Sequence, residues 1–193
     1  MIKRTHLLFF VFFIVSMLFI NGFSICKYAF ADNGGKSMII YFTWSGNSEV
    51  IAKKIQDKTG GDILKLEPVN PYPNDYHSCV EEWIQERDSG ADRELKTVLP
   101  NLSRYDIIYL CYPIWSGTIP TPVKTMLKYN DFSGKLIMPV ASHGGGGAGR
   151  SATDIARLLP QARVGELLSV RGSGGSSLSD TLDRWIHQNG QNR

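Results

Sequence analysis

The sequence contains few cysteines and none of the short motifs that cysteine chemistry needs. Of its 193 residues only three are cysteine (Cys26, Cys79 and Cys111), and no CxxC pair or Cys/His ligand spacing occurs. Neither a thiol-redox motif nor a zinc site is therefore indicated. Cys79 and Cys111 could form a disulfide in an oxidising compartment, but Cys111 lies in an apolar run, where a free cysteine behaves as a small hydrophobic residue. The sequence alone leaves both alternatives open.

The sequence also lacks an excess of charge outside its N-terminus. Lys and Arg together number 21 and Asp and Glu 18, and the difference of three is accounted for by Lys3, Arg4 and Lys27, because residues 1–31 hold no acid. The rest of the chain has 18 basic and 18 acidic residues. This balance removes the electrostatic support for a nucleic-acid partner, and we expect none. With 42% hydrophobic residues, the composition also argues against disorder.

The first 31 residues have the pattern of a secretory signal peptide. Two basic residues precede an apolar run from Leu7 to Ile20, and Ala29–Ala31 has the small-x-small pattern of a cleavage site. We expect cleavage after Ala31 and an exported (periplasmic or extracellular) domain of residues 32–193. The alternative is an uncleaved membrane anchor at 1–31, because the apolar stretch approaches the ~20 residues that span a bilayer. The membrane would then be contacted through this segment only.

Short apolar runs alternate with segments of helical periodicity in the rest of the chain. The expected strands are Met38–Phe42, Asp62–Leu66, Asp106–Tyr112, Lys135–Ala141 and Val164–Val170. The expected helices lie around Ile51–Ile55, Val80–Ile84, Thr121–Lys128, Ser151–Leu159 and Leu178–Ile186. Strands that alternate with amphipathic helices form βαβ units. The sequence therefore predicts an α/β fold, a three-layer doubly wound domain around a five-stranded parallel sheet.

Ligands of such sheets bind beyond the carboxyl ends of the strands, beside the point where the strand order reverses. The loop after the first strand carries hydroxyls, an amide and a glycine in six residues: Thr43, Trp44, Ser45, Gly46, Asn47 and Ser48. It leads into a helix, whose first N–H groups can bind a phosphate. The lysine of a Walker A motif and the GxGxxG of dinucleotide sites are both missing. The alternative is a helix cap without a ligand.

Two further loops follow the third and fourth expected strands. The loop after the third contains a tryptophan between proline and glycine, in Pro113, Ile114, Trp115, Ser116, Gly117 and Thr118. This tryptophan can stack on a planar ligand or can pack the loop against the core. The loop after the fourth is rich in glycine, in Ser142, His143, Gly144, Gly145, Gly146 and Gly147. Glycines let backbone amides approach a ligand closely, although a flexible linker has the same composition.

These three loops carry a resemblance to a known family. TWSGNS, YDIIYLCYPIWSGTIP and ASHGGGGAG resemble, in order and spacing, the three flavin mononucleotide (FMN) loops of the flavodoxin-like family, over residues 37–193. The resemblance implies strand order 2-1-3-4-5 and FMN as cofactor. It places the phosphate on Thr43, Ser45, Asn47 and Ser48, the flavin ring against Trp115 and the backbone of 113–118, and loop 142–147 on the ring's other side or edge. Tyr72–Tyr76 resembles a YPxDY element of one branch of the family.

Two features differ from the electron-carrying members of this family. Those proteins are strongly acidic, whereas residues 32–193 are neutral overall, and they commonly place a second aromatic side chain over the flavin where this chain has His143 and glycines. The expected function is an exported electron carrier that acts with a redox partner protein or a small-molecule acceptor. One alternative is an FMN-dependent NAD(P)H/quinone-type oxidoreductase, and another is a flavin-free binding domain. Because the flavin performs the electron chemistry, no catalytic side chain is expected.

Overall fold

The computed structural model describes residues 36–191. The expected signal peptide and its cleavage site lie outside these residues. Within the described part of the chain, none of the helices combines the length and the apolar character that a membrane span requires.

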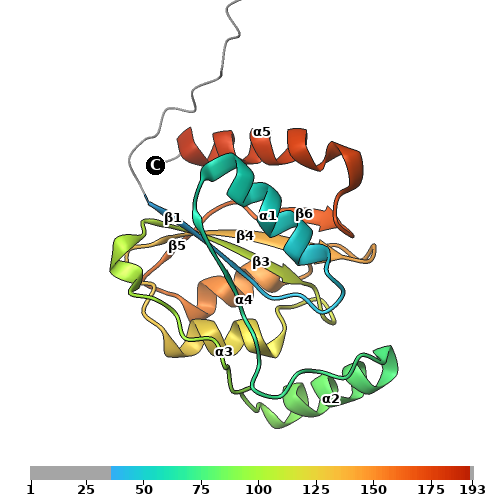
Figure 1. Ribbon diagram of the computed structural model, residues 1–193. Helices are drawn as coiled ribbons and strands as arrows, with labels where there is room; N and C mark the ends of the chain where they lie inside the picture. Colours follow the sequence, from blue (N-terminus) through green and yellow to red (C-terminus); the bar gives the residue numbers. More distant parts are fainter. Residues whose placement is uncertain (1–35, 192–193) are drawn as a thin grey trace, which may run out of the picture. The chain divides into compact units, whose positions relative to one another are not determined.

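A parallel sheet forms the centre of the described domain (Figure 1). Its strands are β1 (Ser37–Tyr41), β2 (Asp62–Lys65), β3 (Ile107–Pro113), β4 (Leu136–His143), β5 (Arg163–Val164) and β6 (Leu168–Arg171). The order is β2-β1-β3-β4-β5, with β6 also paired to β4, and every pairing is parallel. The predicted order 2-1-3-4-5 is confirmed. The strand order reverses beside β1, so the carboxyl ends of β1 and β3 border the binding edge.

The fifth expected strand, Val164–Val170, is wrong as a continuous strand. The structure divides it into β5 and β6, with a break between them. At the break, the Glu166 N–H donates to Asn189 Oδ1 (3.0 Å) and the Glu166 carbonyl accepts from Trp185 Nε1 (2.7 Å). Side chains of the last helix therefore satisfy backbone groups that a continuous strand would have paired with β4.

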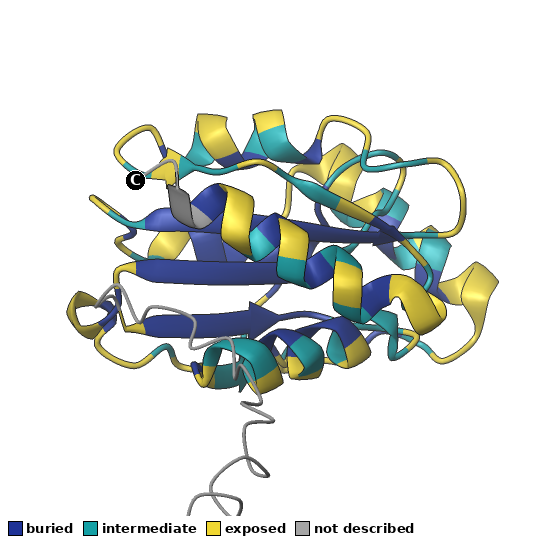
Figure 2. Ribbon diagram, turned by 90° about the horizontal axis from the view of Figure 1, so that it is seen from above, coloured by how far each residue is buried: buried dark blue, intermediate teal, exposed yellow. Residues whose placement is uncertain are grey.

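Helices cover both faces of the sheet. They are α1 (Asn47–Thr59), α2 (Tyr76–Ser89), α3 (Thr121–Tyr129), α4 (Ser151–Leu158) and α5 (Leu178–Gln191), with short 3-10 turns η1 (Leu102–Arg104) and η2 (Gly175–Ser177). Figure 1 shows α1 and α5 on one face and α3 and α4 on the other, with α2 beyond α3. The three predicted layers are thus present. The central strands β1, β3 and β4 are buried along almost their whole length (Figure 2), which explains their continuous apolar sequence, whereas β2, β5 and β6 are partly exposed.

The sheet separates the core into two clusters of side chains. Cys79 packs in the cluster beneath α2 and α3, and Cys111 packs in the cluster beneath α1 and α5. Both cysteines are buried and free, so the disulfide alternative is wrong. Burial raises the pKa of the Cys79 thiol to about 11 and raises that of Cys111 as well, which keeps both thiols protonated and unreactive.

Candidate functional site

The first predicted loop forms a tight turn into α1. Gly46 precedes the helix with a φ of 89°, and no side chain caps the N-terminus of α1. Thr43 Oγ1 accepts a hydrogen bond from the Gly46 N–H (2.9 Å), and Asn47 Nδ2 donates to Ser45 Oγ (3.1 Å). The positive φ favours glycine at position 46. The loop is thus held by its own side chains while the first N–H groups of α1 are left without a side-chain acceptor.

Ser48 is the unusual residue of this loop. Its side chain is fully buried in the first turn of α1, and its hydroxyl oxygen has no hydrogen-bond partner among residues 36–191. A buried hydroxyl without a partner costs free energy, because it has lost its bond to water. An anion held at the N-terminus of α1 would supply the missing partner. The donor set of this loop therefore fits a phosphate group.

The second predicted loop is a two-residue turn. Trp115 and Thr118 exchange two backbone hydrogen bonds (3.0 and 3.1 Å), and the residues between them, Ser116 and Gly117, have φ values of 43° and 78°. Positive φ at both central positions is the geometry of the tight hairpin turn. The Thr118 hydroxyl donates to Asp154 Oδ2 (2.5 Å), which attaches the turn to α4.

Trp115 lies among aromatic side chains rather than in solvent. Its ring is half-buried and makes edge contacts with Tyr72, Phe42 and Trp83, at centroid separations of 4.9, 5.7 and 6.1 Å. These contacts correspond to the core-packing alternative for this residue. Stacking on a flavin ring stays a prediction for the part of the indole that remains exposed.

The third predicted loop is organised around a histidine. His143 Nδ1 accepts from the backbone N–H groups of Gly145 and Gly147, both at 3.1 Å. The Ser142 hydroxyl is also used inside the protein, because it donates to the Gly172 carbonyl (2.7 Å). The loop is therefore a turn with its own internal cap. Gly144 has open space where a side chain would begin.

The second and third loops are fastened to each other. The Ile114 N–H donates to the Ser142 carbonyl (2.7 Å), and the Arg150 N–H donates to the Gly117 carbonyl (2.8 Å). A Cβ atom at Gly149 would lie 2.2 Å from the Gly117 oxygen, so no side chain fits there. The Phe42 ring, just after β1, contacts the Trp115 ring of the second loop. The three predicted loops therefore meet at the carboxyl edge of the sheet.

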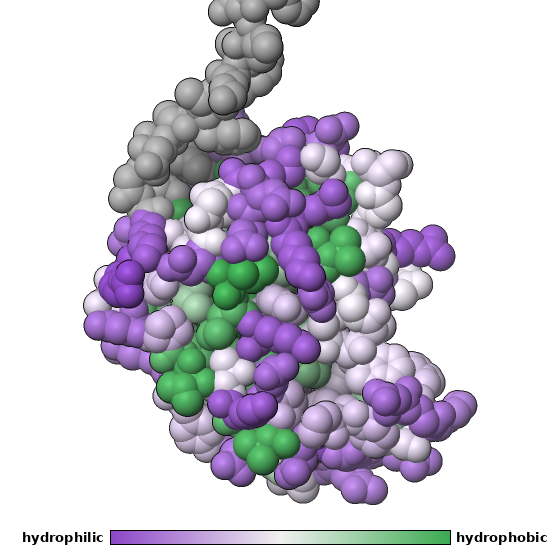
Figure 3. All heavy atoms as spheres, viewed as in Figure 1, coloured by the Kyte–Doolittle hydropathy of each residue, from purple (hydrophilic) through white to green (hydrophobic). Residues whose placement is uncertain are grey.

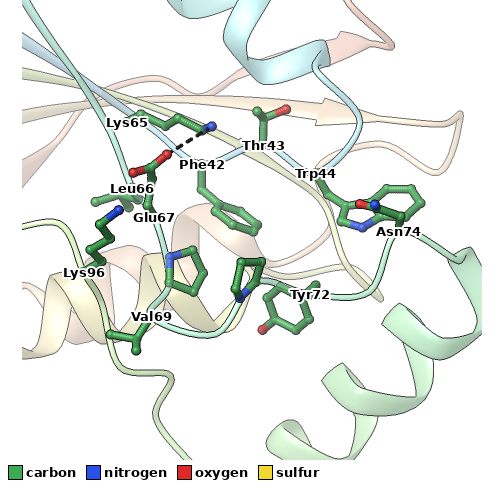
Figure 4. Close-up of a pocket in the computed structure, with 12 residues that line it drawn as sticks. Phe42, Thr43, Trp44, Lys65, Leu66, Glu67, Val69, Tyr72, Asn74 and Lys96 are labelled. Carbon is green, nitrogen blue, oxygen red and sulfur yellow. Dashed lines mark ion pairs between the residues drawn. The ribbon is translucent and has the colours of Figure 1, made fainter.

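A groove of about 360 Å³ opens on the side of the first loop that faces β2 and the segment after it (Figure 4). The residues that line it are Phe42, Thr43, Trp44, Lys65, Leu66, Glu67, Pro68, Val69, Pro71, Tyr72, Asn74 and Lys96. Only Thr43 and Trp44 among these were predicted site residues. Phe42 follows β1 directly, Lys96 lies after α2, and the others come from the end of β2 and the segment after it. Strand β2 lies beside β1 in the predicted order. The adjacency of β1 and β2 in the predicted strand order was the sequence signal that could have indicated this groove.

Arg93 was not predicted at all and anchors this side of the site. Its guanidinium forms ion pairs with Glu82 and Glu86 (2.5 Å to the latter), donates to the Asn70 carbonyl (2.7 Å) and lies 3.7 Å from the centre of the Tyr72 ring. The Tyr72 hydroxyl donates to Glu86. Burial, together with the Glu86 carboxylate, raises the pKa of Tyr72 above its ordinary value. The arginine and its partners therefore hold Tyr72 in one orientation.

The YPxDY element touches both tryptophans of the predicted loops. Trp44 Nε1 donates to the Pro73 carbonyl (2.9 Å), and Tyr72 makes the edge contact with Trp115. Asp75 caps α2 by accepting from the Ser78 N–H (2.9 Å). The element thus connects α2 to the first and second loops.

Comparison with known proteins agrees with this architecture. A candidate flavoprotein from Bacteroides eggerthii has a similar structure (TM-score 0.70, 23% identity, 81% of this chain and 98% of that chain). So does a flavoprotein from Lactobacillus acidophilus, solved in complex with FMN (TM-score 0.65, 18% identity, 79% and 99%). A flavodoxin from the Archaea is more distant (TM-score 0.52, 14% identity, 81% and 97%).

At these identities the structural likeness shows the fold alone. No curated protein matches the chain. A family model described as flavodoxin matches residues 36–189, which is most of the chain and includes all three loops and the segment after β2. The chain therefore belongs to the flavodoxin family.

Proposed function

We propose that this protein binds FMN and transfers electrons outside the cytoplasm. When bound, FMN supplies the electron chemistry, and the protein supplies binding, orientation and tuning of the potential. Membership of the flavodoxin family supports FMN as the cofactor, as does the likeness in fold to the L. acidophilus flavoprotein that was solved with FMN.

The observation that carries the proposal is the buried, unpartnered hydroxyl of Ser48 beside the uncapped start of α1. In the proposed complex Ser48 donates this hydroxyl to the FMN phosphate. Thr43, Ser45 and Asn47 complete a neutral set of donors, and the N–H groups of the first turn add the positive end of the helix dipole. No acidic residue occurs in 43–48, so nothing in this loop repels a phosphate.

The other two loops take the flavin ring in this proposal. Trp115 and the backbone of 113–118 lie against one side, and Ser142, His143, Gly144 and Gly145 lie against the other side or the edge. Their hydrogen bonds to each other make a fixed site rather than one that must be ordered on binding, which favours affinity.

A small-molecule oxidoreductase is the second candidate function. The third loop presents glycines where a covering aromatic residue would stand, and His143 Nδ1 is engaged by the loop's own amides. Because these residues have no large side chain to cover a bound ring, the loop would leave that side of the ring accessible to a quinone-type acceptor or a hydride donor. Export argues against NAD(P)H as the donor, because that pool is cytoplasmic, and favours a redox partner protein. Turnover of a quinone with NAD(P)H by the purified protein would select the oxidoreductase.

Titration with FMN and with riboflavin tests the phosphate assignment. We expect Ser48→Ala to lower FMN affinity about ten-fold or more, because a hydrogen bond to a charged group contributes roughly 1.5–3 kcal/mol. Ser45→Ala and Asn47→Ala should have effects of similar size. Riboflavin, which lacks the phosphate, should bind each variant about as well as the wild type. Ser103→Ala is the matched control, because Ser103 lies in η1, at the amino ends of the strands and away from the predicted loops.

Two outcomes would contradict the proposal. Equal weakening of FMN and riboflavin by Ser48→Ala would show that the residue supports the fold and does not meet the phosphate. Purified protein that is colourless and takes up no FMN would favour the flavin-free binding domain instead.

A further inference from the structure

The groove beside the first loop shares Thr43 and Trp44 with the predicted phosphate loop, but its other lining residues have no role in the proposed FMN site. We propose that it is a separate binding site for a small aromatic molecule that carries one negative charge. The proposal concerns binding in this groove and does not depend on whether FMN is bound. The volume of the groove, about 360 Å³, lies at the lower end of the range for small-molecule sites, which suits a ligand of one or two rings.

Seven of the twelve residues that line the groove are apolar or aromatic, whereas polar atoms make up the larger share of its surface. Phe42 and Leu66 lie at the ends of β1 and β2, and Pro68, Pro71 and Tyr72 follow in the next segment (Figure 4). Val69 is 44% exposed, which leaves apolar surface open to solvent. Figure 3 shows apolar side chains interspersed with hydrophilic ones on the viewed face of the domain. Flat side chains of this kind favour a planar ligand by stacking and by apolar burial.

Two of these walls are held in place before any ligand arrives. Tyr72 is fixed by the Arg93 guanidinium against its ring and by its hydrogen bond to Glu86. Trp44 is fixed by the bond from its indole N–H to the Pro73 carbonyl. The backbone bond from Lys96 N–H to the Glu67 carbonyl (2.8 Å) joins the two segments that form the rim. A preformed groove loses little conformational entropy when it binds a ligand.

The charged side chains of the groove leave one positive charge uncompensated. Lys65 and Glu67 form an ion pair (3.4 Å), whereas Lys96 has no ion pair within residues 36–191. Thr43 and Asn74 are the neutral polar residues of the lining. A groove that presents aromatic side chains, neutral polar groups and a net charge of plus one is complementary to an aromatic monoanion such as a sulfonate or carboxylate.

The test compares two probes of the same shape, 2-naphthalenesulfonate and the neutral 2-naphthalenesulfonamide. Each is titrated into the purified protein at low salt by calorimetry. We expect the sulfonate to bind about three-fold more tightly, as an exposed ion pair provides, and the difference to shrink at high salt. Lys96→Gln should abolish this preference. Lys135→Gln should leave the preference for the sulfonate unchanged, because Lys135 lies just before β4, at the amino ends of the strands.

A second variant probes the groove without touching the hydrogen-bonded network. Val69→Glu places a negative charge on an exposed position of the lining, so the fold should tolerate it, and the sulfonate should lose about three-fold in affinity while the sulfonamide changes little. Equal binding of the two probes by the wild type, or an unchanged preference in Lys96→Gln, would overturn the proposal.

Competition with FMN separates this site from the cofactor site. We expect FMN and the sulfonate to bind independently, and we expect Lys96→Gln and Val69→Glu to keep the FMN affinity of the wild type. Displacement of the probe by FMN would overturn the proposal, because the groove would then belong to the cofactor site. A protein that binds the probe but no FMN would refute the proposed function and leave this inference intact.

Discussion

At the scale of single residues, Trp115 has one observed role, in packing, and one proposed role, against the flavin ring. Its ring packs against Tyr72, Phe42 and Trp83, so it supports the core whether or not a flavin is present. The indole is nevertheless only half-buried and belongs to the loop that the proposed site places against the ring. The two roles can be separated by experiment, because one acts on the flavin-free protein and the other acts on flavin fluorescence.

We expect Trp115→Ala to lower the free energy of unfolding of the flavin-free protein by about 3 kcal/mol, as the loss of a packed aromatic does. It should also release much of the quenching of bound FMN fluorescence. Trp83→Ala removes a more deeply buried neighbour outside the predicted loops and is expected to reduce stability without affecting quenching. If Trp115→Ala changes stability alone, the stacking role is wrong.

At the scale of loops and helices, the contact between the second and third loops depends on a missing side chain. Gly149 has a φ of 55°, and a Cβ atom there would collide with the Gly117 oxygen. We expect Gly149→Ala to lower the free energy of unfolding by about 2 kcal/mol or more, from backbone strain and the displaced turn. FMN affinity should fall with it, because both loops border the proposed ring site.

Gly144→Ala is the control within the same loop. This glycine has no positive φ and nothing lies within 4 Å of the position of its Cβ, so the substitution should leave stability within the error of chemical denaturation. Similar losses in the two variants would show that loop flexibility, and not the close approach of Gly149 to Gly117, is what matters.

The cap of α2 predicts a dependence of stability on pH. Asp75 accepts from both the N–H and the hydroxyl of Ser78 (2.9 Å each), and these bonds hold the pKa of the Asp75 carboxyl below its usual value. A carboxyl whose pKa is lower in the folded state stabilises the fold above its unfolded pKa of about 4, and this contribution disappears as the pH falls through the folded pKa.

Asp75→Asn keeps an acceptor at the cap but removes the titration. We expect the Tm of the wild type to fall more steeply than that of the variant between about pH 5 and pH 2, where carboxyl groups with lowered pKa values protonate. Thermal unfolding followed by circular dichroism at several pH values measures both slopes. Parallel slopes would mean that the charge of Asp75 contributes nothing to folding.

At the scale of the whole molecule, the balance of charge bears on how a redox partner would be recognised. Residues 32–193 have no net charge, and the three predicted loops, 43–48, 113–118 and 142–147, contain no acidic residue. Long-range attraction to a strongly basic partner is therefore not built into the proposed site. Association with a partner should depend on local contacts and should vary little with salt.

The proposed export also concerns the molecule as a whole, and it would depend on residues outside the described domain. We expect Ala31→Trp to block processing, since the peptidase needs a small residue at this position, and to leave a precursor in the membrane fraction. Mass spectrometry of the wild type should find a chain that begins at Asp32. A full-length wild-type chain in the membrane fraction would instead support the anchor.

Much of the fold and the place of the site could be predicted from local sequence pattern. Apolar runs such as Asp106–Tyr112 alternate with helical periodicity, and the carboxyl ends of parallel strands must meet at one edge of the sheet. The loops that follow those strands were therefore the segments in which we predicted the site. Gly46 and Ser48 are local features as well. The turn into α1 requires a glycine at position 46, and the helix that follows places the Ser48 hydroxyl in its first turn.

Contacts between distant segments were decided only by the tertiary structure. The fifth strand breaks because Trp185 and Asn189 take the backbone groups of Glu166. Arg93 lies against the Tyr72 ring, and the backbone bond from Lys96 to Glu67 joins two segments that line the groove. Such pairs have no periodicity along the chain. They follow from which loops the packed helices and strands bring side by side, and buried polar groups then bond to whichever partner lies within reach.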